Sequence, residues 1–160
     1  MPMAFKPTCD LYDEHLDSAR VLTIPLINLG GASEFCGTAV TVKCFEDNSR
    51  IKELVAGDGG GSVMLVDGGG SLRCALVGDV LAGEAQRNGW AGVIVFGAVR
   101  DKAALRSLDL GVMAIGVTPR KSVRRGEGQI GVPIQLGDIW CCPGDSVYAD
   151  EDGVLILDSE

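Results

Sequence analysis

Two short apolar runs joined by a helical segment constrain the fold of this chain more than any other feature. Val63–Val66 and Val93–Phe96 are each flanked by glycine-rich turns, which is typical of strands buried on both faces. The segment from Gly78 to Asn88 lies between them and carries Leu81 and Ala85 at helical spacing. Such a strand–helix–strand unit has parallel strands and a right-handed connection. The sequence therefore predicts an α/β fold with this unit at its centre.

The remaining elements are predicted from the same signals. A short helix is expected over residues 8–16, with Thr8 as a possible N-cap and Leu11, Tyr12 and Leu16 on one face. The apolar stretch 21–29 is broken by Pro25 and is predicted to be extended, at a sheet edge. Further helices are expected at residues 48–56 and 102–108, and strands at 35–45, 112–117, 132–136, 138–142, 146–149 and 154–157. The prediction is one domain over residues 1–160, with a parallel centre and a β-rich C-terminal third.

Charge and composition narrow the class of protein. A net charge of −8 argues against binding to a nucleic-acid backbone, although Arg120, Lys121, Arg124 and Arg125 form one basic cluster. No apolar run approaches the 18 residues or so that a membrane span requires, and the N-terminus lacks the pattern of a secretory signal. The six cysteines form no C-x-x-C pair, and the chain has a single histidine, so no zinc site is expected. Most of the cysteines are predicted to be buried, none is expected to form a disulfide, and a cytoplasmic location is predicted.

Several generic motifs carry little functional meaning here. Residues 126–131 match G-x-G-x-x-G, but a strand start rather than a helix follows, so a glycine-rich turn is expected. Gly68–Ser71 lacks the lysine of a phosphate-binding loop and is predicted to be a tight turn. His15 is expected to be a surface residue of a helix. Cys141 and Cys142 are neighbours in a strand and should point to opposite faces.

Two pairs of residues at element ends are better candidates for a functional site. Gly78 and Asp79 begin the central helix, where unpaired backbone amides and the helix dipole favour a carboxylate ligand. Arg100 and Asp101 follow the second central strand. A structural interpretation stays open, in which Asp79 only caps its helix and Asp101 only caps the segment 102–108.

The same residues carry a resemblance to a known family. Gly78-Asp79, followed after twenty residues by Arg100-Asp101, resembles the signature of the 4-hydroxy-4-methyl-2-oxoglutarate aldolases, a family that includes the regulators of ribonuclease E activity A. Longer stretches resemble the regulator branch especially closely: Thr41–Asn48, Val66–Ser71, Gly97–Arg100 and Tyr148–Asp150. The resemblance covers nearly the whole chain. It implies a three-layer β/β/α fold of the swivelling-domain kind and a ring-shaped homotrimer.

The resemblance also implies a set of roles. Asp101 would hold a divalent cation, Mg²⁺ or Mn²⁺, whose other ligands are largely water. Arg100 would face the keto oxygen and stabilise the enolate, and Asp79 would orient a metal-bound water or assist proton transfer. The backbone amides from Gly78 to Leu81, including those of Asp79 and Val80, would bind the pyruvyl carboxylate. The implied reaction is the cleavage of 4-hydroxy-4-methyl-2-oxoglutarate to two pyruvates, with oxaloacetate decarboxylation through the same enolate as a side activity.

One residue departs from the family pattern, and a second function competes. Ala104 stands where the extended pattern has an acidic residue three positions after the metal aspartate, so an outer contact to the metal is expected to be missing. The overall likeness and the acidic composition also fit a protein that binds ribonuclease E and inhibits it. That alternative leaves no short motif, and it is compatible with the aldolase activity.

Overall fold

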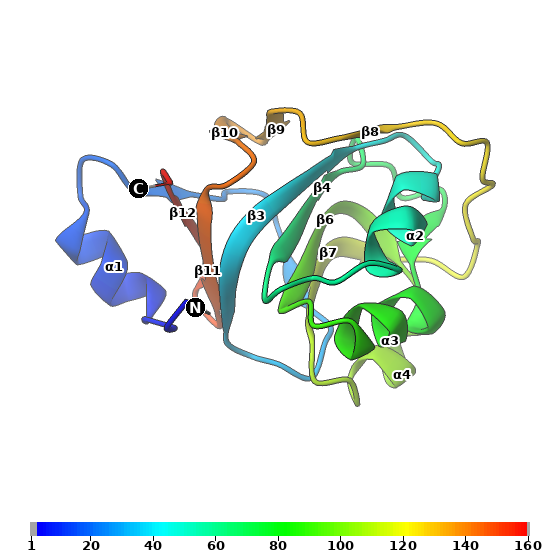
Figure 1. Ribbon diagram of the computed structural model, residues 1–160, viewed down its shortest axis with the longest axis horizontal. Coiled ribbons are helices and arrows are strands. Elements are labelled where there is room, and N and C mark those ends of the chain that lie inside the picture. The colour runs from blue at the N-terminus through cyan, green and yellow to red at the C-terminus, as the bar shows by residue number, and fades with distance from the viewer. Residues whose placement is uncertain (1–2, 160) are drawn as a thin grey trace.

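A ten-stranded mixed sheet organises the computed structural model, which describes residues 3–159 (Figure 1). The strand order along its main path is β1-β12-β11-β3-β4-β6-β7-β2. The four central strands, each parallel to its neighbour, are β3 (Phe35–Lys43), β4 (Val63–Asp67), β6 (Gly92–Val99) and β7 (Gly111–Val117). The strand–helix–strand unit expected from the sequence is therefore present, with β4 and β6 side by side.

Three helices cover one face of this sheet and a fourth lies apart (Figure 1). The helices on the sheet are α2 (Ser49–Val55), α3 (Asp79–Arg87) and α4 (Lys102–Leu105). The fourth, α1 (Thr8–Glu14), lies beyond β11 and β12 at the other end of the molecule. The N-cap of α1 is Pro7 rather than Thr8, whose hydroxyl instead donates to Asp150. Of its predicted apolar face only Leu11 is buried, because Tyr12 and Leu16 have no layer to pack against.

A two-stranded hairpin forms a third layer on the opposite face of the sheet. Its strands are β9 (Ile134–Leu136) and β10 (Ile139–Cys141). Alternate side chains of the central strands divide between the two faces: Met64 joins the apolar cluster under the helices, whereas Leu65 packs with Leu136 under the hairpin. Strands buried on both faces need continuous apolar runs, which is what the sequence supplies. The expected three-layer β/β/α fold is confirmed.

Short antiparallel strands complete the sheet on both sides. β11 (Ser146–Asp150) and β12 (Gly153–Leu157) extend it past β3. The two outermost strands are β1 (Arg20–Val21) on β12 and β2 (Ile27–Asn28) on β7. The chain thus crosses from one edge of the sheet to the other between them, and the prediction of an extended edge segment around Pro25 is confirmed.

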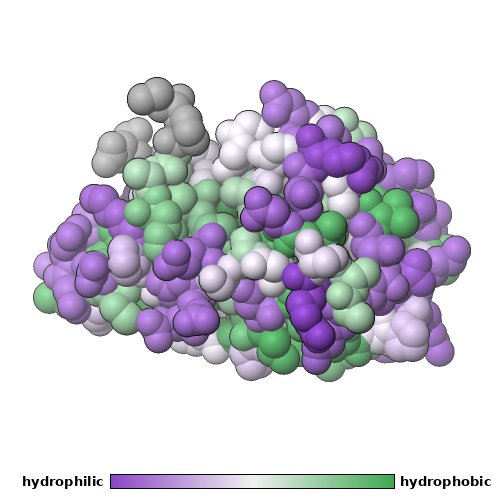
Figure 2. Space-filling view, turned by 90° about the horizontal axis from the view of Figure 1, so that it is seen from below, coloured by the Kyte–Doolittle hydropathy of each residue, from purple (hydrophilic) through white to green (hydrophobic). Residues whose placement is uncertain are grey.

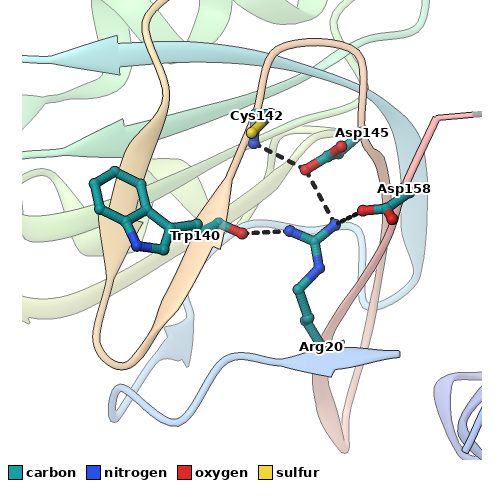
Figure 3. Close-up of polar contacts among 5 residues, drawn as sticks. All are labelled: Arg20, Trp140, Cys142, Asp145 and Asp158. Carbon is teal, nitrogen blue, oxygen red and sulfur yellow. Dashed lines mark hydrogen bonds and ion pairs between the residues drawn. The ribbon is translucent and has the colours of Figure 1, made fainter. Parts of the chain in front are cut away.

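Arg20 fastens β1 to the turn that precedes β11 (Figure 3). Its guanidinium donates to the carbonyl of Trp140 and forms ion pairs with Asp145 at 3.2 Å and Asp158 at 2.7 Å. Asp145 is buried, and its Oδ2 atom also accepts the backbone N–H of Cys142 at 2.8 Å. A buried carboxylate needs such partners, because leaving it unpaired would cost several kcal/mol.

Two strands were not expected from the sequence. β5 (Ala75–Val77) pairs with β6 immediately before α3, and its three residues are too few to give a periodic signal. β8 (Gln129–Ile130) pairs with the end of β3 and lies inside the G-x-G-x-x-G stretch, which is therefore partly strand rather than only a turn. No helix follows it in the described chain, so the strand–helix context that a dinucleotide site requires is not found there.

The cysteines differ in burial and in reactivity. All six thiols are unpaired, and Cys141 is buried at the end of β10, whereas Cys142 is exposed and lies just beyond the strand rather than within it. Burial of the cysteines is wrong for Cys9 and Cys142 and holds fully for three of the six. Burial raises the pKa of Cys44 and Cys141 to about 12, which keeps both thiols protonated and unreactive. None of the helices between residues 3 and 159 is both long and apolar enough to cross a membrane.

Candidate active site

A cleft of about 290 Å³ opens where β5 and β6 end and α3 begins. One wall consists of the residues that the sequence singled out: Gly78, Asp79, Val80, Leu81, Arg100 and Asp101. The opposite wall is the segment from Lys121 to Arg124, and Asn48, Ala75 and Leu76 complete the lining. Ligand sites of open α/β sheets occur at the carboxyl ends of the parallel strands. The structure thus brings all six predicted site residues to one such place.

Gly78 is required by a close approach rather than by an unusual backbone conformation. Its φ of −131° is open to any residue, but a Cβ atom would lie 2.7 Å from Oδ2 of Asp101 and 3.2 Å from Cγ of Arg100. Any larger residue would therefore displace the carboxylate or the guanidinium. The group that approaches Gly78 in the structure is the side chain of Asp101.

Asp101 links two helices. Its backbone is left-handed, with φ 63° and ψ 42°, a conformation that aspartate tolerates better than most residues. Oδ2 accepts the backbone N–H of Asp79 at 3.0 Å, and this bond is the main reason why the pKa of Asp101 is lowered; the Asp79 side chain and Arg100 add to it. No hydrogen bond is formed with Oδ1 by the residues described. One oxygen is therefore fixed and the other is available.

The prediction that Asp79 and Asp101 cap the helices they begin is wrong, because neither side chain makes a capping bond to its own helix. Gly78 is the N-cap of α3, and Asp79 is its first helical residue with no capping side-chain bond. Asp101 is the N-cap residue of α4 but makes no side-chain capping bond there; its carboxylate accepts from the first residue of α3 instead. The carboxylate of Asp79 therefore has no capping role in α3. The N–H groups of Val80 and Leu81 have no hydrogen-bond partner among the described residues.

Arg100 reaches across the cleft. Its backbone N–H donates to Val77 at 2.9 Å, which fixes the end of β6 against β5. The guanidinium lies 3.9 Å from Oδ2 of Asp101 and donates to the carbonyl of Pro119 at 3.4 Å. It is 39% exposed, so much of its donor capacity faces the cleft. A planar cation held between two walls suits a carboxylate or an enolate oxygen.

The opposite wall was missed by the sequence analysis as part of the site. Ala75 donates to the carbonyl of Arg120 at 2.6 Å and accepts from Ser122 at 3.2 Å, which places the segment beside β5. Arg124 donates through Nε to Oδ1 of Asn48 at 3.0 Å, and the Asn48 amide donates to Leu76 at 2.8 Å. The basic cluster was the available signal, but nothing local showed that it folds back onto the central unit.

The buried carboxylate of Asp47 holds the backbone that follows this wall. Although burial works against ionisation of Asp47, hydrogen bonds from Ser49, Arg125 and Glu127 lower its pKa to about 2. The backbone N–H of Arg125 donates to it at 2.7 Å and that of Glu127 at 3.2 Å. The segment that carries Lys121 to Arg124 is therefore tied at both ends, to β5 and to the start of α2.

The oxygen donors of the cleft suit a divalent cation that keeps most of its water ligands. Among the described residues no three histidine, cysteine or acidic side chains cluster closely enough to hold a metal by themselves. Asp101 offers the free Oδ1 atom, and Asp79 lies in the same cleft. One or two carboxylates, with water and substrate as the remaining ligands, is the arrangement that Mg²⁺ favours. The residues fit such an ion, and Ala104 adds no further oxygen.

Comparison with known proteins places the chain among its relatives. The sequence pattern described as RraA-like, Aldolase/RraA, matches residues 8–156. A protein of Alcanivorax borkumensis is 53% identical over 92% of this chain and 93% of its own length, and one of Alkalilimnicola ehrlichii is 49% identical over 94% and 93%. Both are provisionally named 4-hydroxy-4-methyl-2-oxoglutarate aldolase.

Solved structures of the same fold carry more than one function in their titles. The RNA-processing inhibitor RraA of Thermus thermophilis superposes with a TM-score of 0.93 and 40% identity, covering 98% of this chain and 94% of that one. A Geobacillus kaustophilus protein titled S-adenosylmethionine: 2-dimethylmenaquinone methyltransferase gives 0.94 and 42%, covering 97% and 96%. The shared fold, the extent of the matches and their identity lead to one conclusion: this chain is a member of the RraA-like family.

Proposed function

We propose that the protein is a divalent-metal-dependent aldolase that cleaves 4-hydroxy-4-methyl-2-oxoglutarate to two molecules of pyruvate. The observation that carries this proposal is the meeting of Arg100 and Asp101 with the open N-terminus of α3 in one cleft. The names of the two relatives at about 50% identity support the same reaction.

The residues of the cleft suit the two ends of the reacting group. The free N–H groups of Val80 and Leu81 would bind the carboxylate next to the ketone, where the helix dipole also favours negative charge. The guanidinium of Arg100 would then face the keto oxygen. Because this oxygen becomes negative only as the carbon–carbon bond breaks, Arg100 would stabilise the transition state more than the substrate.

Cleavage requires the movement of one proton off the substrate. The C4 hydroxyl loses its proton to a base as the C3–C4 bond breaks, so C4 becomes the ketone of one pyruvate. The bonding electrons pass to the keto oxygen of the other fragment as an enolate, which takes up a proton at C3 to give the second pyruvate. Asp79 is the candidate base, acting directly or through a water, since its carboxylate has no capping duty. A Mg²⁺ or Mn²⁺ ion held by Asp101 would supply Lewis-acid stabilisation of the enolate oxygen.

The same site would decarboxylate oxaloacetate. Loss of CO₂ from that substrate leaves the electron pair on the carbon next to the ketone, which is again the pyruvate enolate. No proton has to be removed first, so this side activity depends on Arg100 and the metal and less on Asp79.

We further propose that the protein is a cytoplasmic homotrimer with the cleft near a subunit boundary. Support comes from two large apolar side chains that line the cleft and are left exposed: Val80 is 73% exposed and Val123 63%. Clustered apolar exposure of this kind is typical of an interaction surface. Sedimentation should give three times the mass of one chain, and a monomer at micromolar concentration would contradict the proposal.

The decisive experiment measures pyruvate. Purified protein is incubated with 4-hydroxy-4-methyl-2-oxoglutarate or oxaloacetate, with Mg²⁺ and after removal of metal with a chelator. Pyruvate should form only with the metal and should return when Mg²⁺ is added back. Release that is unchanged in the chelated protein, or absent under all conditions, would contradict the aldolase proposal.

Ribonuclease binding is the second candidate, and an acidic surface favours it. At the end of the molecule that holds α1, the side chains in Figure 2 are largely hydrophilic. The acidic residues there flank α1 and the turn between β11 and β12: Asp10, Asp13, Glu14, Asp17, Glu151 and Asp152. The Thermus thermophilis relative is titled an RNA-processing inhibitor. We propose that a basic, disordered segment of ribonuclease E would bind at this end, far from the cleft.

The two candidate functions separate experimentally. Asp101→Ala should leave binding to a basic ribonuclease segment intact, whereas replacing Asp13 and Asp152 by asparagine should weaken it and make it less sensitive to salt. Loss of binding in a folded Asp101 variant would instead show that both functions use one surface. The methyltransferase title finds no support in the cleft, because the described residues that line it include no aromatic side chain on which an adenine could stack.

A further inference from the structure

We propose that the wall formed by Lys121, Ser122 and Arg124 is a second carboxylate subsite, which selects 2-oxo acids that carry a distal carboxylate. The inference rests on the proposed function, because it assigns the first carboxylate to the α3 side of the cleft. It concerns the opposite wall, for which the enolate chemistry requires no residue.

Ser122 provides the first observation. The residue is 8% exposed, and its hydroxyl is a buried polar atom with no hydrogen-bond partner in the described structure. The backbone N–H of Ser122 donates to the carbonyl of Ala75 at 3.2 Å. Leaving a buried hydroxyl unpaired costs about 1–3 kcal/mol, which a folded protein normally avoids. Ser122 lines the cleft, and rotation about its Cα–Cβ bond carries the hydroxyl between staggered positions, so a bound oxygen could supply the missing partner.

Charge provides the second observation. Lys121 and Arg124 flank Ser122, and no carboxylate of the described residues lies within ion-pairing distance of either cation. With Arg100 the cleft holds three cations against the two carboxylates Asp79 and Asp101. This local surplus stands out in a chain whose net charge is −8. Three cations exceed what one carboxylate and one enolate oxygen need, so a second anionic group fits the excess.

The wall is also rigid enough to act as a binding site. Arg124 uses only Nε for its bond to Asn48, which leaves both terminal nitrogens of the guanidinium for a ligand. Asn48 is itself buried and bound to Leu76, and Asp47 holds the backbone of Arg125. Because the arginine is already oriented, little side-chain freedom would be lost on binding. A guanidinium held in this way can bind a carboxylate through two parallel hydrogen bonds.

A matched pair of ligands tests the subsite without requiring catalysis. 2-Oxoglutarate and 2-oxopentanoate have the same five carbons and the same 2-oxo carboxylate, and only the first has a distal carboxylate. Calorimetry in saturating Mg²⁺ should show that the wild type binds 2-oxoglutarate at least 10-fold more tightly. Ser122→Ala and Lys121→Gln should each reduce this preference about 5- to 10-fold, roughly the net value of one ordinary hydrogen bond. Affinity for 2-oxopentanoate should stay unchanged.

Arg120→Gln is the matched control. Arg120 is the neighbour of Lys121, is exposed and does not line the cleft, so removing its charge should change the preference less than 2-fold. Equal wild-type affinity for the two ligands, or equal weakening of both by the variants, would overturn the subsite. If the preference is present while no pyruvate is released from any substrate, the subsite stands and the aldolase proposal fails.

Discussion

The backbone N–H of Asp79 donates to Oδ2 of Asp101 at 3.0 Å. Asp101 follows β6, and its carboxylate therefore caps α3, the helix that precedes β6 in the chain. One side chain thereby joins the start of α3 to the end of β6, the two elements that form the predicted site. The bond leaves Oδ1 available to a cation and accounts for the lowered pKa of Asp101. It also means that replacements of Asp101 act on both the fold and the chemistry, and the choice of replacement can separate them.

Asp101→Asn and Asp101→Ala should differ in stability but not in activity. Asparagine keeps an oxygen for the Asp79 N–H and tolerates the left-handed backbone, whereas alanine does neither. We expect both variants to lose metal-dependent pyruvate release on the order of 10²-fold or more, the scale for loss of one stabilising group. Only Asp101→Ala should also lose about 1 kcal/mol or more of stability, measured by denaturant unfolding. If Asp101→Asn still released pyruvate at the wild-type rate, Asp101 would not be the residue that holds the metal.

Arg100→Lys should reduce oxaloacetate decarboxylation on the order of 10²-fold or more, because an ammonium cannot meet two oxygens with a planar fork. Arg120→Lys is the control, since it makes the same guanidinium-to-ammonium replacement outside the cleft and should keep full activity. Initial rates of CO₂ or pyruvate release measure both. Near-normal decarboxylation by the Arg100 variant would show that the enolate is stabilised elsewhere.

Asp79→Asn and Asp79→Ala test chemistry with little interference from folding. Because the Asp79 side chain caps nothing, both variants should unfold within about 0.5 kcal/mol of the wild type, as is usual for surface positions. Aldol cleavage should fall at least about 10²-fold in both if Asp79 is the base for the C4 hydroxyl. Decarboxylation, which needs no such base, should fall less. Equal losses in the two reactions would assign Asp79 to the binding of substrate or metal instead.

Gly78→Ala should abolish activity while the protein still folds. The added methyl group would lie 2.7 Å from Oδ2 of Asp101 and must push that carboxylate or Arg100 aside. Gly83→Ala, on the same helix, is the matched control: its nearest neighbour is the flexible Arg87 guanidinium at 3.4 Å. Removing a mid-helix glycine should stabilise the protein by about 0.5–1 kcal/mol and leave the kinetics unchanged. Full activity of Gly78→Ala would mean that the observed packing is not needed.

Acid should destabilise the wall opposite α3 through Asp47. Its pKa is lowered from an ordinary 3.8 to about 2 in the folded protein, so the stabilisation is present above pH 3.8 and is lost as the pH falls towards 2. Linkage puts the contribution at about 2 kcal/mol. Asp47→Asn should remove this part of the pH dependence, and in urea unfolding the gap between variant and wild type should be largest near pH 7. A constant gap from pH 7 to pH 2 would contradict the assignment.

The sequence predicted the parallel centre because its strands are buried on both faces and leave long apolar runs. It predicted the six residues on one side of the cleft because they sit at the ends of those runs. Ser122 and Asn48 could not be found in this way, since their roles depend on contacts across the fold: Asn48 reaches Leu76, and Ser122 lies against Ala75. β5 was missed for the same reason, because three residues become a strand only when β6 is beside them.

The strand order has a consequence for folding during synthesis. The parallel centre and its helices are complete once residues 35–117 have left the ribosome, but the far edge of β3 pairs with β11, which follows almost thirty residues later. Until Ser146–Asp150 emerges, the first four residues of β3 on that edge present unpaired N–H and C=O groups, and such an edge can pair with another nascent chain. Translation speed over the last third of the message is therefore expected to influence how much of this protein reaches its native state, and slowing it should increase aggregation.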